Sequence, residues 1–154
     1  MRLHTEVRRT CLAYSPGGHY AELMRALDGI DFTDRFDATF ASARTVDPAA
    51  RRTYHLCHPR RSLARLALNI AQTLFMLLRE RPALVISSGA DVAVASVILA
   101  RLMGATAIFI ESSGSVRPTL AGRLVYPFCH LFIVQWPEQL DAFPKAILAR
   151  GILA

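Results

Sequence analysis

Two side chains that can carry a proton follow apolar runs typical of buried strands. His19 closes a glycine-rich segment after the run Thr10–Tyr14, and Glu111 directly follows the run Thr106–Ile110. The carboxyl ends of parallel strands meet at one edge of a sheet, so both side chains should face one crevice. An imidazole or a carboxylate at that position can take the proton of a substrate hydroxyl, which is general-base chemistry.

Each of these residues also has a purely structural alternative. His19 can simply cap the helix that follows the tight turn, and Glu111 can accept hydrogen bonds from its own loop. Glu22, three residues after His19, either completes a capping arrangement or orients the imidazole. We favour Glu111 as the base and His19 as a residue that positions the substrate, and substitution of each residue would distinguish these roles.

Small and polar residues at the same predicted edge could bind a substrate. Glycines permit close approach of the backbone and a helix N-terminus attracts anions, so the loop Ser15–His19 is a candidate site. The segment Ser87–Asp91 opens on the same edge, although Asp91 could be a plain N-cap instead. Arg117 could pair with a phosphate or with Glu111, or could be solvated. The candidate substrate-binding residues are Ser15, Gly17, Gly18, Ser88, Gly89, Ser112 and Arg117.

Several other chemistries are disfavoured. The glycine loop lacks the GxGxxG pattern of dinucleotide sites, which argues against a nicotinamide cofactor and against a stand-alone nucleotide-binding module. His55 and His58 have HxxH spacing without a nearby carboxylate pattern, so we predict no metal site and no cofactor. The net charge of +6 indicates an anionic partner, and nucleic acid, an anionic membrane or a phosphorylated substrate would each satisfy it.

Alternating apolar and amphipathic segments must position these residues. Predicted strands cover Thr10–Tyr14, Asp37–Ala41, Thr53–Cys57, Leu84–Ser87, Thr106–Ile110, Leu131–Gln135 and Ala146–Leu148. Predicted helices cover Tyr20–Leu27, Ser62–Glu80, Asp91–Met103, Leu120–Cys129 with an interruption or bend at Pro127, and a short segment that begins at Pro137. Strands that are apolar on both faces and alternate with helices predict an α/β, Rossmann-like, doubly wound parallel sheet, in a single domain over residues 1–154.

The long predicted helix contains an uncharged run, Leu66–Leu78, in which a thin polar stripe is formed by Asn69, Gln72 and Thr73. The remaining apolar face is wider than contact with one sheet requires, and arginines precede it. This pattern is typical of an interfacial helix on an anionic leaflet, and a helix wedged between the sheet and a neighbouring helix is the alternative. The candidate membrane residues are Arg60, Arg61, Arg65, Leu74, Phe75 and Leu78.

Four segments carry a resemblance to a known family: Ser15–Met24 (SPGGHYAELM), Leu84–Gly89, Ile110–Arg117 and Phe132–Pro137. In order and spacing they resemble the family that contains the membrane-anchoring subunit of the eukaryotic dolichol-pathway N-acetylglucosaminyltransferase. The bacterial PssD-type capsule and exopolysaccharide subunits belong to the same family. The resemblance runs from about Thr10 to the end of the sequence.

The resemblance implies the acceptor-binding, N-terminal half of a GT-B glycosyltransferase such as the peptidoglycan lipid II GlcNAc-transferase. A separate donor-binding chain would complete the enzyme, and we expect this chain alone to be inactive because no second domain precedes its end at Ala154. The implied reaction moves a sugar from a UDP-sugar to a polyprenyl-diphosphate-linked saccharide at the cytoplasmic face of a membrane. The implied partners include no nucleic acid. A non-catalytic subunit that recruits its partner to the membrane is the alternative.

Two departures from the family pattern favour a bacterial member that acts on a polysaccharide precursor. Eukaryotic members carry an N-terminal transmembrane anchor, whereas the polar segment Met1–Arg9 is no such anchor. No later segment reaches the roughly 18 apolar residues that span a bilayer, so we expect peripheral membrane contact. Pro16 stands where the family pattern has a small residue.

Overall fold

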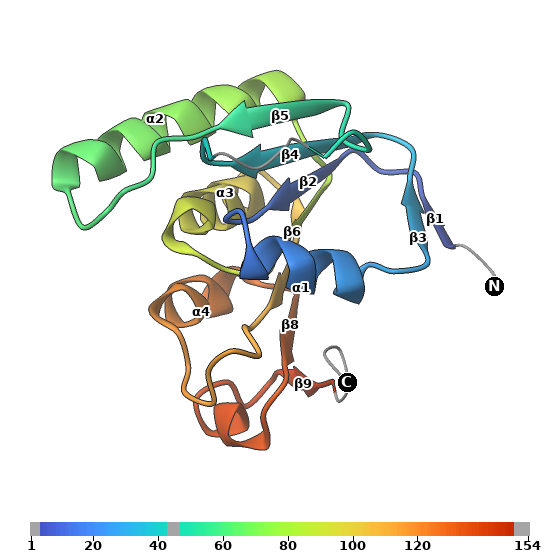
Figure 1. The fold of residues 1–154 in the computed structure, drawn as a ribbon, viewed down its shortest axis with the longest axis vertical. Coiled ribbons are helices and arrows are strands. Elements are labelled where there is room, and N and C mark those ends of the chain that lie inside the picture. The colour runs from blue at the N-terminus through green and yellow to red at the C-terminus, as the bar shows by residue number, and fades with distance from the viewer. Residues whose placement is uncertain (1–3, 43–46, 150–154) are drawn as a thin grey trace.

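The computed structural model describes residues 4–42 and 47–149, and its centre is a seven-stranded sheet (Figure 1). The strands are β2 (Thr10–Ala13), β4 (Arg35–Thr39), β5 (Arg52–His55), β6 (Leu84–Ser87), β7 (Thr106–Ile110), β8 (Leu131–Val134) and β9 (Ile147–Leu148). Their order across the sheet is β5-β4-β2-β6-β7-β8-β9, and every neighbouring pair is parallel. The predicted parallel α/β sheet is therefore confirmed.

The chain changes its direction of travel across the sheet between β2 and β6. It first passes outward from β2 to β4 and β5, then returns to β6 on the other side of β2 and continues to β9. Strands β2 and β6 are paired in register from Thr10 with Leu84 to Ala13 with Ser87. Open α/β sheets bind ligands beyond the carboxyl ends of strands at such a switch in strand order.

Helices cover both faces of the sheet, as a doubly wound fold requires (Figure 1). On one face α1 (Gly18–Ala26) buries Leu23 against a cluster that includes Leu12 and Ile86. On the other face lie α2 (Leu63–Glu80), α3 (Asp91–Leu102) and α4 (Leu120–Val125). Their buried residues, among them Met76, Val97 and Val125, pack in one cluster with Phe109 and Phe132 of the sheet.

Residues with a positive φ set the ends of two helices. Arg81 ends α2 with a φ of 47° immediately before Pro82, which has no amide hydrogen to continue the helix. Gly89 and Ala90, with φ of 114° and 79°, turn the chain into α3. The expected N-cap at Asp91 is wrong, because Ala90 occupies the cap position and Asp91 is the first helical residue. A carboxylate in that first turn still interacts favourably with the helix dipole.

The structure departs from the predicted elements in two further places. The short strands β1 (His4–Glu6) and β3 (Ile30–Phe32) form a separate parallel pair that was not predicted, because each is too short to show a period. The predicted helix Leu120–Cys129, expected to be interrupted or bent at Pro127, ends as an α-helix at Val125, where the chain tightens into a 3₁₀ turn, η1 (Tyr126–Phe128). Proline removes the amide that a continuing helix would need.

Candidate functional site

The glycine loop leaves an open surface at the carboxyl end of β2. Gly17 is the N-cap of α1 and has a φ of 109°, a conformation that glycine adopts without steric strain. A Cβ built on Gly18 would meet nothing within 4 Å, so this part of the loop faces free space. The loop therefore presents the start of α1 to whatever lies above the switch between β2 and β6.

His19 and Ser88 lock the loops after β2 and β6 together. The Nδ1 atom of His19 lies 2.9 Å from the carbonyl oxygen of Ser88, and the Ser88 hydroxyl donates to the carbonyl of His19 at 2.7 Å. A carbonyl can only accept, so Nδ1 carries the proton and Nε2 of the neutral ring keeps its lone pair. The His19 side chain is 30% exposed, so the imidazole is partly accessible from the surface. The structure thus brings together two predicted site residues.

Gly89 is needed for this close pairing. A Cβ at Gly89 would lie 3.3 Å from Cε1 of His19, and the φ of 114° would strain any other residue. The loop Ser87–Ala90 therefore passes directly beneath the imidazole. Glycine at position 89 therefore leaves the space that the His19 ring occupies.

Glu22 connects α1 to the loop that follows β7. One carboxylate oxygen accepts a 2.8 Å hydrogen bond from the backbone amide of Ser113 and a short one from the Ser113 hydroxyl. The other carboxylate oxygen lies 3.9 Å from Nδ1 of His19. Glu22 is buried, so it acts from beneath the surface to fix both loops relative to the imidazole.

Glu111, the second predicted proton carrier, is enclosed by its own loop. It is 1% exposed, and its carboxylate accepts hydrogen bonds from the amides of Ser112 (3.0 Å) and Thr119 (3.3 Å) and from the Thr119 hydroxyl (2.8 Å). Thr119 is also the N-cap of α4, because its hydroxyl accepts from the Gly122 amide. A Cβ at Gly122 would lie 2.0 Å from Oε2 of Glu111. These contacts hold the loop in shape and leave His19 the more accessible of the two.

Gln139 is a site residue that the sequence did not reveal. It lies in the 3₁₀ helix η2 (Pro137–Asp141), is fully buried, and accepts hydrogen bonds through Oε1 from the two backbone amides at 135 and 136. Its Nε2 donates to the carbonyl of Ser115 at 2.9 Å. The indole of Trp136, 39% exposed, donates to the carbonyl of Ser113 at 2.8 Å. The only sequence signal was a glutamine two residues after the proline that begins η2.

Two further predicted binding residues, Ser112 and Arg117, lie on the loop that follows β7. Ser112 accepts a hydrogen bond from the Gly114 amide through its hydroxyl, at 3.2 Å. Arg117 is exposed, and within residues 4–42 and 47–149 it makes no ion pair. Its guanidinium is therefore available to an anion. In the same described ranges, no cluster of three or more His, Cys, Asp or Glu residues could hold a metal ion.

A buried ionic cluster supports α1 from below. Arg35 donates to both carboxylate oxygens of Asp37 and to Asp47, while Tyr14 and Tyr20 donate to Asp37 and Asp47 respectively. Burial raises the pKa of Asp37 despite the guanidinium beside it. Burial also acts to raise the pKa of Asp47, but hydrogen bonds from the Ala49 amide, Tyr20 and Arg35 together bring it below its usual value. The cluster fixes the first turn of α1, which carries His19.

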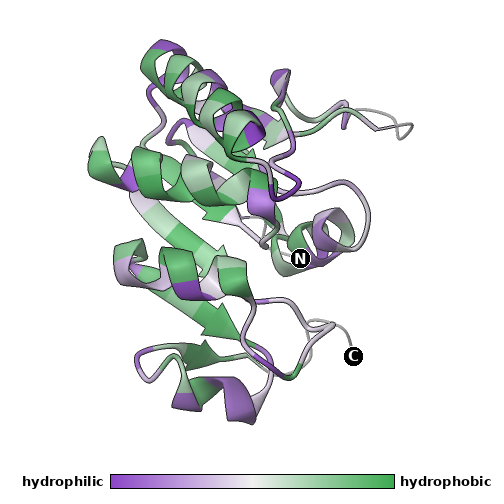
Figure 2. Cartoon of the chain, turned by 90° about the vertical axis from the view of Figure 1, so that its left-hand side faces the viewer, coloured by the Kyte–Doolittle hydropathy of each residue, from purple (hydrophilic) through white to green (hydrophobic). Residues whose placement is uncertain are grey.

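The polar stripe on α2 faces the protein rather than solvent. Asn69 donates to the carbonyl of Cys57 at 2.8 Å, and Gln72 accepts from the Cys57 amide at 2.6 Å. The apolar side is therefore turned outward, and Phe75 and Leu78 are 62% and 54% exposed. Figure 2 shows apolar residues recurring along α2 and α3 on this side of the molecule. The exposed apolar side chains of α2 are Leu63, Leu66, Leu68, Ile70, Leu74, Phe75 and Leu78.

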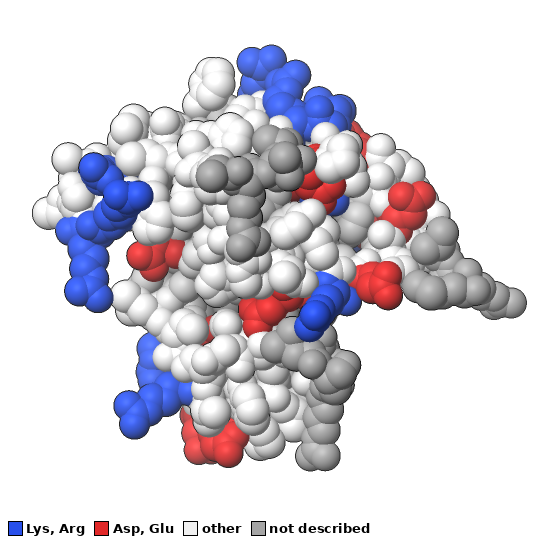
Figure 3. All heavy atoms as spheres, in the orientation of Figure 1, with Lys and Arg blue, Asp and Glu red and all other residues white. Residues whose placement is uncertain are grey.

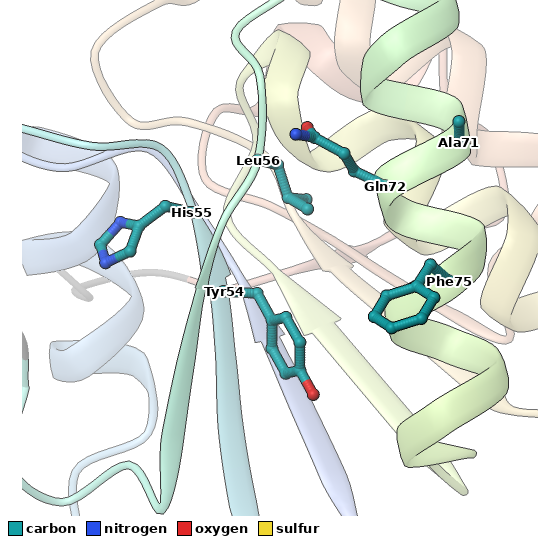
Figure 4. A pocket seen from close by; sticks show the side chains of 6 residues that line it. All are labelled: Tyr54, His55, Leu56, Ala71, Gln72 and Phe75. Carbon is teal, nitrogen blue, oxygen red and sulfur yellow. The ribbon is translucent and has the colours of Figure 1, made fainter.

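A hollow and a group of arginines accompany this apolar surface. The hollow, about 420 Å³, lies between β5 and α2, with Tyr54, Leu56 and Phe75 in its wall (Figure 4). Basic side chains gather over the start of α2 (Figure 3). Arg60 and Arg61 both have a positive φ, 45° and 56°. With Arg65 they are exposed, and the described part of the chain gives none of the three an ion pair.

No helix in the described ranges is both long enough and apolar enough to cross a membrane.

Two solved structures with the same fold come from proteins that are about twice as long as this chain. MurG from Acinetobacter baumannii matches 93% of this chain at a TM-score of 0.67 and 13% identity. UDP-GlcNAc 2-epimerase from Methanocaldococcus jannaschii matches 89% of it at a TM-score of 0.63 and 12% identity. The chain spans 45% and 42% of these two proteins. It thus has the Rossmann-like α/β fold of part of the GT-B proteins.

Comparison at the level of sequence identifies the family. The chain is 42% identical over 40 residues to the UDP-N-acetylglucosamine transferase subunit ALG14 of Yarrowia lipolytica, a match that spans 25% of this chain and 18% of that relative. The family model described as "Oligosaccharide biosynthesis protein Alg14 like" matches residues 50–153. That match includes the Ser88 loop, the Glu111 loop, α2 and η2. The chain belongs to the Alg14-like family of oligosaccharide biosynthesis proteins.

Proposed function

We propose that this chain is the acceptor-side subunit of a two-component glycosyltransferase, over residues 1–154, with the donor site on a separate subunit. The observation that carries the proposal is the His19–Ser88 pair at the switch between β2 and β6. Membership of the Alg14-like family and the partial match to a UDP-N-acetylglucosamine transferase subunit support it. The likeness to part of MurG supports a role in one half of a GT-B cleft.

The proposed reaction transfers a sugar from a UDP-sugar to a polyprenyl-diphosphate-linked saccharide, in polysaccharide or lipid-linked oligosaccharide biosynthesis. The acceptor hydroxyl oxygen attacks the anomeric carbon of the donor, the bond from that carbon to the UDP oxygen breaks, and UDP leaves with the electron pair. The hydroxyl proton passes to a general base on the acceptor side. This chain contributes the base and the acceptor-binding loops.

We assign the base to His19 and a supporting role to Glu111. This reverses the preference drawn from the sequence, and the reason is accessibility. The Ser88 carbonyl holds the proton on Nδ1 of His19, so Nε2 is free to accept. The Glu111 carboxylate is buried and engaged with Thr119, which suits it to hold the loop that presents Ser112 and Arg117. Arg117 and the glycine loop Ser15–Gly18 would bind sugar oxygens of the acceptor and the diphosphate of the donor.

We further propose that α2 contacts the cytoplasmic face of a membrane peripherally. Its outward face exposes Leu74, Phe75 and Leu78, and Arg60, Arg61 and Arg65 precede or begin the helix. Apolar side chains enter the headgroup region while guanidinium groups pair with anionic lipids. A lipid-linked acceptor would reach the site from the same membrane.

Turnover of the reconstituted two-subunit complex tests the assignment. The His19→Ala variant should lose on the order of 100-fold in turnover at saturating substrate, because a general base contributes a factor of that size. Glu111→Gln keeps the shape of the side chain, so it should retain most of its turnover once its stability is allowed for. Gel filtration must show that both variants still assemble with the donor subunit.

A recruitment-only subunit is the second candidate function, and the exposed apolar face of α2 favours it. In that case neither His19→Ala nor Glu111→Gln would change turnover while assembly is intact. Full turnover by this chain without any partner would refute both candidates. Loss of turnover in Glu111→Gln alone would return the base to Glu111.

A further inference from the structure

A groove of about 190 Å³ runs between α2 and α3 on the side of the molecule away from α1. Its wall is apolar except at one end, where Asp91 stands. The α3 residues that line it are partly exposed, so the groove is open to the surface along its length. The lining residues are Leu66, Ile70, Asp91, Val94, Ala95, Ile98 and Leu99.

One end of this groove lies close to the candidate site. Leu66 belongs to the first turn of α2 and Asp91 to the first turn of α3, so the groove begins where both helices begin. Asp91 follows Ser88 by three residues, and Ser88 is bonded to His19. An elongated ligand in the groove would therefore have its head next to the loops at the carboxyl edge of the sheet.

The charges at this end favour an anionic head group. Arg60, Arg61 and Arg65 lie within or just before the first turn of α2, are exposed, and have no ion pair among the described residues. Asp91 is the one acidic residue in the wall. Three guanidinium groups against one carboxylate leave a positive surplus, so an amphiphile with a phosphate head and an apolar tail matches both parts.

We propose that the groove between α2 and α3 binds the isoprenoid chain of the acceptor lipid, with the diphosphate held by the arginines at the start of α2. The inference rests on the proposed function for the identity of the lipid. Continuity of the groove with the His19 edge favours an acceptor over a bulk phospholipid. The outward face at Phe75 and Leu78, farther round α2, remains for the bilayer.

Isothermal titration calorimetry with farnesyl diphosphate, on the full chain without membrane or partner, tests this directly. Leu66→Glu should weaken binding about tenfold, because it puts a charge on the groove wall next to the tail. Leu68→Glu is the matched control: Leu68 is another exposed leucine of α2, outside the groove, and its variant should bind as wild type. Both substitutions are on the surface, and thermal unfolding should show both variants folded.

Competitors separate the parts of the ligand. Inorganic diphosphate alone should bind at least about tenfold more weakly than farnesyl diphosphate, because it lacks the tail. Asp91→Asn should tighten farnesyl diphosphate binding by removing the repelling carboxylate. Equal affinity of the Leu66→Glu and wild-type chains would overturn the proposal. A short-chain phosphatidylglycerol that competes as well as farnesyl diphosphate would assign the groove to bilayer lipid instead.

Two further outcomes have separate meanings. If sedimentation shows a dimer that Leu66→Glu dissociates, and farnesyl diphosphate does not bind, a second copy of the chain covers the groove and the proposal fails. If groove-dependent binding is found but the reconstituted complex transfers no sugar, the groove stands as an isoprenoid diphosphate site and the proposed function fails.

Discussion

The loops at the carboxyl edge of the sheet and the outer face of α2 differ in which side chains they bury: the loops bury polar side chains, and the α2 face exposes apolar ones. In the loop cluster, Glu22, Glu111 and Gln139 are buried, and each is hydrogen bonded to loop backbone. On α2 the polar stripe is bonded inward to Cys57, and large apolar side chains stand in solvent. The loop cluster is shaped by this chain alone, whereas the α2 face calls for an apolar environment from outside.

The largest expected effect would break the loop cluster. Gly122→Ala should destabilise the fold by about 2–4 kcal/mol, because its Cβ would lie 2.0 Å from a Glu111 oxygen that hydrogen bonds hold in place. Urea unfolding measures the change. Gly18→Ala is the control, since its Cβ meets nothing within 4 Å, and it should change stability by no more than about 0.5 kcal/mol. Equal stability of the two variants would mean that Glu111 moves freely.

The ionic cluster beneath α1 should give the fold an acid-sensitive component. The pKa of Asp47 is lowered on folding from its usual 3.8, so its contribution is present above that pH and is lost as the pH falls through the lowered pKa. Asp47→Asn should therefore reduce the slope of unfolding free energy against pH below about 4, by at most roughly 1.4 kcal/mol per pH unit.

Chemical unfolding at a series of values between about pH 2 and about pH 7 gives the slope of unfolding free energy against pH for each variant. Asp31→Asn, at an exposed position, serves as the control. Because burial raises the pKa of Asp37, that carboxylate works in the opposite sense and loses its contribution as the pH rises. A slope unchanged by Asp47→Asn would show that the hydrogen bonds of Asp47 do not persist in solution.

A substitution on the exposed apolar face of α2 should change liposome binding and leave the unfolding free energy nearly unchanged. Phe75→Glu should weaken association with anionic liposomes by about tenfold, the order expected for losing one buried aromatic side chain at the interface. Its unfolding free energy should change by no more than about 0.5 kcal/mol, because the side chain is exposed. Co-sedimentation at low and high salt measures the binding, and salt should weaken it.

An exposed leucine on another helix controls for the added charge. Leu102 is exposed and lies at the end of α3, so Leu102→Glu should leave liposome binding unchanged. If Phe75→Glu binds liposomes as wild type does, then the apolar face of α2 has some other cover. Loss of binding in both variants would point to net charge alone.

The smallest effect is expected at the margin of the loop cluster. Trp136 is partly exposed and donates a single hydrogen bond to Ser113 from its indole. Trp136→Phe keeps the ring but removes the donor, and should cost about 0.5–1.5 kcal/mol of unfolding free energy. Thermal unfolding measures it. A loss as large as that of Gly122→Ala would place Trp136 within the cluster rather than at its margin.

The sequence predicted where the loops would gather but not how they would bond. Apolar runs ending at Tyr14, Ser87 and Ile110 were enough to place His19, Ser88 and Glu111 at one edge, because parallel strands align their carboxyl ends. That Glu111 is enclosed depends on Thr119, eight residues away across an irregular loop. No period or propensity encodes such a contact.

The direction of the α2 stripe is a similar case. The spacing of Asn69, Gln72 and Thr73 predicted a polar stripe, and solvent is the usual neighbour of such a stripe. Here the backbone of Cys57 takes its place, a contact between residues 12 to 15 positions apart in sequence. The candidate membrane residues were therefore chosen from composition, and their outward orientation became visible only in the fold.

The turn at Arg60 and Arg61 places a constraint on how this protein can be improved. Two consecutive non-glycine residues in left-handed conformations cost roughly 1–2 kcal/mol each, and glycine at either position would recover much of that energy. A search for thermostable variants would therefore select glycine here and remove the guanidinium groups next to α2. Among variants at this turn, a higher melting temperature should therefore be accompanied by a lower affinity for anionic ligands.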